Sequence, residues 1–217
     1  MDLFEALYTT RAMRRVSPDP VDDEVAAAML DAAIRAPSGG NSQNWRFVVV
    51  TDPKVRSELG PIYRSAFDQL QDTYYQGRWE DAKQSGDESA LAVMKSSGWL
   101  AENFEKVPMW FLAFSRNDPS GASIYPAVWS AMLAARGHAI GTCLTTILGV
   151  FESAAIFAVL EVPTDKGWVL SAAVSVGHPT GRWGVAPRKP VEEMAFSDRW
   201  DQSLAFAVDG PLWPPRS

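Results

Sequence analysis

Hydrophobic and polar positions follow patterns that predict helices and strands in loose alternation along the chain. Runs rich in β-branched and aromatic residues predict buried strands at 45–51, 109–115, 142–148 and 168–177. Helices are expected at 2–10, 23–36, 123–140 and 151–160, and after Asp52-Pro53. This order favours an α+β fold in which helices flank a mixed sheet.

Capping and breaking residues set several of the expected helix ends. Asp22 or Asp23 can cap the helix that begins near residue 23, and Ser123 can cap the alanine-rich helix. Pro37 ends the helix at 23–36, because the residue before a proline is pushed out of the helical conformation. The helix at 23–36 has one apolar face, formed by Val25, Met29, Ala32 and Ala33.

Residues 65–106 are expected to be mostly helical but interrupted. The polar, glycine-bearing stretch at 84–88 predicts a mobile crossing or lid. Tyr74, Tyr75 and Trp79 have the aromatic character that suits a site for flat molecules, although ordinary packing accounts for them equally well.

Composition narrows the class of protein. The 217 residues suit a single domain, and a net charge of −6 argues against nucleic-acid binding through phosphate contacts. The one cysteine, Cys143, excludes an internal disulfide and fits a cytoplasmic location. The N-terminus lacks the order of a signal peptide, and no apolar run is long enough to span a membrane.

Several common site motifs are missing from the chain. Neither GxGxxG nor GxxxxGK[ST] occurs, so the usual nucleotide-binding loops are absent, and GxSxG is absent as well. His138 and His178 lie far apart in sequence and no HExxH occurs, so a metal site is not expected.

Four short stretches carry the candidate chemistry. They are TRAMRR with three arginines, APSGGNSQNW at 36–45, TCLTTILG, and GHPTGRWGVAPRKP at 177–190. The paired N–H donors of an arginine guanidinium match phosphate oxygens, and glycines let a backbone approach a ligand closely. Each stretch also has a structural explanation on its own: a solvated charged turn, a well-made turn, a threonine-rich strand and a proline-stiffened tail.

Taken together, their order and spacing resemble the nitroreductase family of flavoproteins. That family carries RRSxRxF, APSxxNxQPWxF, a threonine-containing strand after an alanine-rich helix, and GxPxxxxxxxxRxP before the tail. The resemblance covers residues 1 to about 201 of this chain. It implies a mixed, mainly antiparallel sheet flanked by helices, in one domain over 1–217. It also implies a homodimer with FMN at the subunit interface, whose C-terminal extension, 190–217, packs on the partner.

The resemblance also assigns roles to the matching residues. Arg11 and Arg188 are expected to hold the FMN phosphate, and Arg14 to lie near the N1/C2-carbonyl edge of the flavin. Ser38 and Gly39 would contact the pyrimidine or ribityl part, Asn41 the ring edge, and Thr145 and Thr146 the N5/C4-carbonyl side. Ala12 and Pro37 belong to the same cofactor-binding segments, and Arg15 either serves the phosphate or packs outside. The resemblance assigns no side chain a catalytic role.

Three departures from the family pattern stand out. Ala12 replaces a common serine, Asn44 replaces a proline, and Trp129-Ser130 replaces a Gln-Asn pair. The first removes a side-chain hydrogen bond to the cofactor, and the last alters the interface or the face over the flavin. None of them removes a charge needed for phosphate.

The implied activity is FMN-dependent transfer of reducing equivalents. NAD(P)H gives hydride to flavin N5, and a small organic acceptor such as a nitroaromatic or quinone then takes the electrons in a ping-pong order. The sequence does not choose between NADH and NADPH as the electron donor, and it does not identify the acceptor. The alternatives are a same-fold enzyme that dehalogenates, fragments flavin or uses a deazaflavin, a flavin-binding protein without catalysis, and a structural domain without a cofactor.

Overall fold

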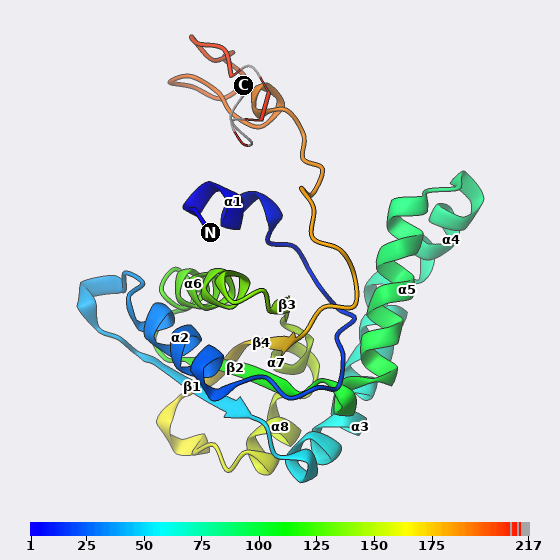
Figure 1. Ribbon diagram of the computed structural model, residues 1–217, viewed down its shortest axis with the longest axis vertical. Helices are drawn as coiled ribbons and strands as arrows, with labels where there is room; N and C mark the ends of the chain where they lie inside the picture. The colour runs from blue at the N-terminus through cyan, green and yellow to red at the C-terminus, as the bar shows by residue number, and fades with distance from the viewer. Residues whose placement is uncertain (209, 212, 214–217) are drawn as a thin grey trace. The chain divides into compact units, whose positions relative to one another are not determined.

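The computed structural model describes residues 1–208, 210, 211 and 213 (Figure 1). The chain divides into two compact units, one formed by Ala12–Arg182 and a smaller one formed by Met1–Arg11 with Trp183–Ser217. The interpretation of 1–217 as one domain stays a prediction. So does the packing of 190–217 on a partner, and positions 209, 212 and 214–217 of that segment lie outside the described residues.

The larger unit is built on a four-stranded sheet in the order β1-β2-β4-β3. Its strands are β1 (Trp45–Val50), β2 (Met109–Ser115), β3 (Gly141–Thr145) and β4 (Val169–Gly177). All three pairings are antiparallel, and a parallel bridge joins Ala12 to Thr142 beside β3. The predicted α+β fold with a mainly antiparallel sheet is therefore confirmed.

Helices cover both faces of the sheet (Figure 1). One face packs on α2 (Asp23–Ile34) and α6 (Ile124–Gly137), with a core that includes Met29, Phe111 and Val128. The other face packs on the helices α3 (Pro53–Leu70), α7 (Ile147–Phe151) and α8 (Ser153–Val159). Strand β2 lies between these layers and is buried along its whole length, as its uninterrupted apolar sequence MWFLAFS predicts.

One strand prediction was wrong in part. The run at 142–148 was expected to be a strand, but β3 ends at Thr145 and helix α7 begins at Ile147. A short apolar run has the same pattern in a buried strand and in a buried helical turn, so periodicity does not separate them. The helix expected at 151–160 is correspondingly shorter, because Phe151 belongs to α7 and α8 begins at Ser153.

The caps differ from expectation in two helices. Asp22 stands at the cap position of α2 but makes no side-chain capping bond. At α6, Ser123 uses its hydroxyl to accept a hydrogen bond from the backbone of Gly39, at 3.3 Å. Asp118 caps this helix instead, since its carboxylate accepts the backbone N–H of Ile124 at 2.9 Å. Helix α6 ends at Gly137, before the predicted residue 140.

The segment after α3 is helical and interrupted, as predicted. A π-helical turn, Gln71–Tyr75, connects α3 to α4 (Gln76–Ser85), and α5 (Glu88–Glu102) follows. Gly86 ends α4 in a left-handed conformation, with φ at 68°, and Asp87 caps α5 by accepting the backbone N–H of Ala90. The mobility expected for this stretch stays a prediction.

The smaller unit contains α1 (Leu3–Thr9), capped by Asp2, and a 3₁₀ turn at Val191–Glu193. The rings of Tyr8 and Trp213 contact each other within it, with centroids 5.8 Å apart. Several of its large apolar side chains are exposed, among them Leu3, Phe4, Met194, Trp200 and Phe206. Among the described residues, no helix combines the length and apolar character needed to cross a membrane.

Candidate functional site

The segment that follows Arg11 lies against the ends of β3 and β4. Its backbone is held by hydrogen bonds from Met13 N to Thr142 O at 2.9 Å and from Thr180 N to the carbonyl oxygen of Arg15 at 3.1 Å. Gly141 makes the close approach possible, because a Cβ atom there would lie 2.9 Å from the Cβ of Met13. This anchoring places the side chain of Arg14 above β3.

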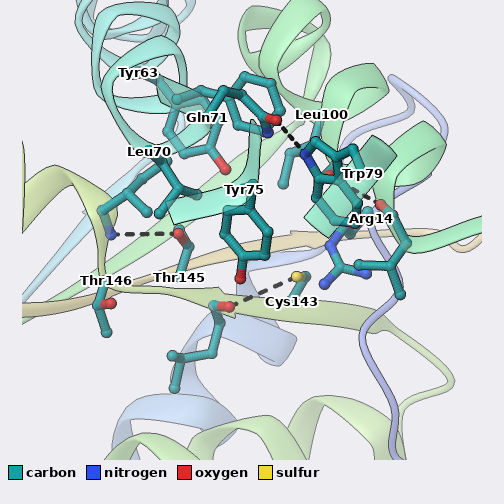
Figure 2. Close-up of a pocket in the computed structure, with 15 residues that line it drawn as sticks. Arg14, Tyr63, Leu70, Gln71, Tyr75, Trp79, Leu100, Cys143, Thr145 and Thr146 are labelled. Carbon is teal, nitrogen blue, oxygen red and sulfur yellow. Dashed lines mark hydrogen bonds between the residues drawn. The ribbon is translucent and has the colours of Figure 1, made fainter. Parts of the chain in front are cut away.

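Arg14 borders a cavity of about 270 Å³, hereafter the Arg14 cavity (Figure 2). The end of β3 and the start of α7 form its floor, from Cys143 to Ile147. Helix α3, the π-helical turn, α4 and α5 supply its walls, through Tyr63, Phe67, Leu70, Gln71, Tyr75, Trp79, Val93, Ser97 and Leu100. Three of the predicted cofactor residues, Arg14, Thr145 and Thr146, therefore meet in one place.

Arg14 brings an uncompensated positive charge to this cavity. One of its guanidinium nitrogens donates to the Ser96 hydroxyl on α5, at 3.4 Å. Within the described part of the chain, no Asp or Glu lines the cavity and no carboxylate pairs with Arg14. Most of the guanidinium donors are therefore available to a ligand that carries oxygen atoms or negative charge.

Tyr63 supports the floor of the cavity from α3. Its ring packs against the stacked pair of Phe104 and Trp110, at centroid distances of 5.0 and 5.7 Å, and the Thr145 side chain lies near its hydroxyl. Burial raises the pKa of Tyr63, and the nearby Thr145 hydroxyl only partly opposes that shift. The Thr145 oxygen accepts the backbone N–H of Ile147 at 3.5 Å, which ties this side chain to the start of α7.

Cys143 lies in the floor of the Arg14 cavity but is poorly suited to be a nucleophile. Burial raises the pKa of its thiol, and the nearby Arg14 charge only partly opposes that shift. The thiol proton points to the carbonyl oxygen of Leu144, at 3.7 Å. A protonated, buried thiol is unreactive, so Cys143 contributes packing to the cavity.

The wall opposite the floor is aromatic. The rings of Tyr75 and Trp79 stack at 4.7 Å with an interplanar angle of 9°. The Trp79 indole N–H donates to the side-chain oxygen of Gln71, and the Arg78 guanidinium lies over both rings. Figure 2 shows Gln71, Tyr75 and Trp79 on the same side of the cavity.

The loop at 36–45 lines a different cavity of about 500 Å³, hereafter the Ser38 cavity. Pro37, Ser38 and Gly39 face residues 116–123 there, and the Ser38 hydroxyl accepts the backbone N–H of Gln43 at 3.1 Å. A third cavity, of about 540 Å³, shares Thr146 with the Arg14 cavity and residues 117–120 with the Ser38 cavity. The two predicted cofactor segments are therefore connected along the surface of the larger unit but not joined in one pocket.

The remaining predicted residues lie outside these cavities. Asn41 has a left-handed conformation, with φ at 52°, and its side-chain oxygen accepts a bond from Gln43. Ala12 pairs with Thr142, and the Arg15 side chain is exposed. Arg11 and Arg188 belong to the smaller unit and are exposed, with Arg188 donating to the carbonyl oxygen of Pro187.

Comparison with known proteins identifies the class. The model of the nitroreductase family matches residues 7–178. The chain is 26% identical to a 5,6-dimethylbenzimidazole synthase of Rhodobacter capsulatus, over 82% of this chain and 83% of that protein. It is 26% identical to an NADH dehydrogenase of Thermus thermophilus, over 90% of this chain and 96% of that protein. The crystal structure of an FMN- and NADPH-dependent nitroreductase from a sphigopyxis strain aligns with a TM-score of 0.68 and 22% identity, covering 90% of this chain and 98% of that one.

This protein belongs to the nitroreductase family, because the family model spans well over half of the chain and the fold agrees. The residues that sequence reasoning did not select are Tyr63, Gln71, Ser96 and Cys143. Of these, only Gln71 had a usable signal, since it stands four and eight residues before Tyr75 and Trp79.

Proposed function

We propose that this protein binds FMN in the Arg14 cavity and passes reducing equivalents from NAD(P)H to a small organic acceptor, such as a nitroaromatic or a quinone. The observation that carries the proposal is the convergence of Arg14, Thr145 and Thr146 under an aromatic wall in a member of the nitroreductase family. When bound, FMN supplies a ring that takes a hydride from the nicotinamide and returns the electrons to the acceptor.

The residues of the cavity fit such a group. The Arg14 guanidinium and the hydroxyls of Thr145 and Thr146 are donors for carbonyl oxygens and ring nitrogens, and Leu70 and Ile147 offer apolar contact to a flat ring. The unpaired charge of Arg14 stabilises negative charge that develops on a bound ring.

We also propose that two copies of the chain complete the site. Ser38 and Gly39 line a separate cavity from Arg14, so they suit contact with a cofactor held mainly by a second copy. The exposed apolar side chains of the smaller unit, such as Trp200 and Phe206, support packing of this segment on a partner subunit. A cytoplasmic homodimer is the expected form.

The decisive experiment is the visible spectrum of freshly purified protein, followed by identification of the molecule that heat releases from it. A flavin spectrum, released FMN, and oxidation of NADH or NADPH that depends on a nitroaromatic or quinone would support the proposal. A yellow protein that no nicotinamide reduces would favour a flavin-binding protein without catalysis. Release of a deazaflavin, or turnover only with a halogenated aromatic, would favour another chemistry on the same fold.

Replacing both Arg11 and Arg188 with alanine should yield protein that has lost FMN on purification. These exposed arginines are proposed to hold the phosphate, and each charge-assisted contact contributes roughly 1.5–3 kcal/mol. The measurement is the flavin-to-protein absorbance ratio, with Arg35→Ala, an exposed arginine paired to Asp31, as the matched control. A double variant that retains a full complement of FMN refutes the assignment.

A further inference from the structure

We propose that Gln71, Tyr75 and Trp79 form the element that recognises the electron acceptor, and that this element selects planar aromatic compounds carrying a carboxylate or another oxygen-rich anionic substituent over cationic ones. The inference deepens the proposed function and rests on it. The three side chains are hereafter called the recognition wall.

The backbone brings these side chains together at a break in helical regularity. Gln71 and Tyr75 are the first and last residues of the π-helical turn, and Trp79 follows one turn later in α4. All three line the Arg14 cavity, although residues 72–74 between them are mostly exposed and do not. Single π-helical turns are frequent at functional sites.

The contact between Gln71 and Trp79 fixes which end of the amide faces the indole. An indole N–H can only donate, so the atom that faces it must be the amide oxygen. The amide nitrogen of Gln71 therefore keeps two N–H donors, and among the described residues they have no acceptor. The recognition wall presents Gln71 as a donor toward oxygen, because Trp79 prevents the amide from turning over.

The stacked rings of Tyr75 and Trp79 give the wall a flat apolar surface. Trp79 is buried, its ring face stacks on Tyr75, and its indole N–H binds Gln71. These contacts within the protein fix the aromatic surface before any ligand binds. A preformed aromatic surface suits a planar ring, since little conformational freedom is lost when the ligand stacks on it.

Two positively charged side chains lie at the recognition wall. The Arg78 guanidinium lies 5.6 Å from the Tyr75 ring centre and 5.9 Å from that of Trp79, while Arg14 stands in the same cavity. No carboxylate lines the cavity within the described residues. A ligand with a negative substituent therefore gains attraction from both arginines, and a cationic ligand of the same shape meets repulsion.

Benzoate and benzamidine test the inference, because they share a flat ring, differ in the sign of the charge, and cannot be reduced. Their dissociation constants for the FMN-loaded protein are measured from quenching of tryptophan fluorescence and from the change in flavin absorbance. We expect benzoate to bind at least about tenfold more tightly than benzamidine, as one charge-assisted hydrogen bond provides. Equal affinities for the two compounds would overturn the proposal.

Variants of the wall assign the preference to its residues. Gln71→Leu keeps an uncharged side chain and removes its donors, so benzoate affinity should fall about tenfold with benzamidine unchanged. Gln71→Glu should reverse the order of the two compounds, and Trp79→Phe should weaken benzoate because the amide is freed. Gln69→Leu is the matched control, since Gln69 binds Glu152 and does not line the cavity. Unchanged benzoate binding in Gln71→Leu would overturn the role of Gln71.

Steady-state kinetics with two nitroaromatic compounds of opposite charge test the selectivity of the wall separately from the proposed function. The kcat/KM for 4-nitrobenzoate should exceed that for 4-nitrobenzylamine in the wild type, and Gln71→Leu should reduce the ratio mainly through KM. Turnover of both compounds with equal kcat/KM would overturn the inference and leave the proposed function in place. Selective benzoate binding without any NAD(P)H oxidation would overturn the proposed function while supporting the selectivity of the wall.

Discussion

Replacing Gly149 with alanine is expected to destabilise the larger unit by about 3 kcal/mol, at the upper end of what overpacking produces. Gly149 lies in α7, where a Cβ atom would stand only 2.0 Å from the backbone carbonyl oxygen of Leu170 in β4. Backbone atoms of a central strand cannot move aside as a flexible side chain can. The helix must therefore shift away from the sheet and carry Thr146 and Ile147 with it.

Urea unfolding followed by circular dichroism measures this effect as a lower midpoint with an unchanged slope. Gly98→Ala is the matched control, because Gly98 lies inside α5 with open space around the added Cβ. Alanine there should leave stability equal or raise it by up to about 1 kcal/mol, since glycine is unfavourable inside a helix. A Gly149→Ala protein that unfolds at the wild-type urea concentration contradicts the close approach of α7 to β4.

Replacing Arg14 with alanine is expected to lower the kcat/KM for the acceptor by about 100-fold, the usual effect of removing one preorganised donor from developing negative charge. Arg14 is the one charged side chain among the described residues that line the cavity. Steady-state kinetics with FMN added in excess measure the loss and separate it from simple loss of cofactor. A redox titration should show a more negative flavin potential, since the reduced ring loses its neighbouring cation.

Two further variants separate the charge of Arg14 from its packing. Arg14→Lys retains the charge but not the planar fork, so it should recover part of the activity. Ser96→Ala removes only the 3.4 Å bond between Arg14 and α5 and should have a small effect. An Arg14→Ala enzyme with full kcat/KM in the presence of excess FMN would show that the cavity charge plays no part in the reaction.

Much of the fold could be predicted from local pattern. Strands β1, β2 and β4 and the existence of α2 and α6 followed from apolar runs and one-face periodicity. The boundary between β3 and α7 could not, because a short apolar run has the same pattern in a buried strand and in a buried helical turn. The close approach of Gly149 to Leu170 joins segments 21 residues apart, and no local pattern encodes it.

The candidate site could be predicted only where motifs carried it. Arg14, Thr145 and Thr146 were expected near the flavin, and the structure brings them into one cavity. Tyr63 could not be selected, because its role arises from packing on Phe104 and Trp110. The recognition wall was only partly predicted, since Tyr75 and Trp79 were singled out as aromatic residues, while Gln71, four and eight residues before them, was not.

The anchoring of Arg14 has a consequence for how the family can diversify. Main-chain atoms hold the segment around it, through Met13 N to Thr142 O and Thr180 N to the carbonyl of Arg15. Because these bonds join main-chain atoms, they do not depend on the side chains at positions 12 and 15. Substitutions at those positions therefore leave the backbone that carries the Arg14 guanidinium in place. Alanine at position 12 therefore leaves the anchoring intact, whereas a larger residue in place of Gly141, where an added Cβ atom would lie 2.9 Å from the Cβ of Met13, would push the segment away from β3.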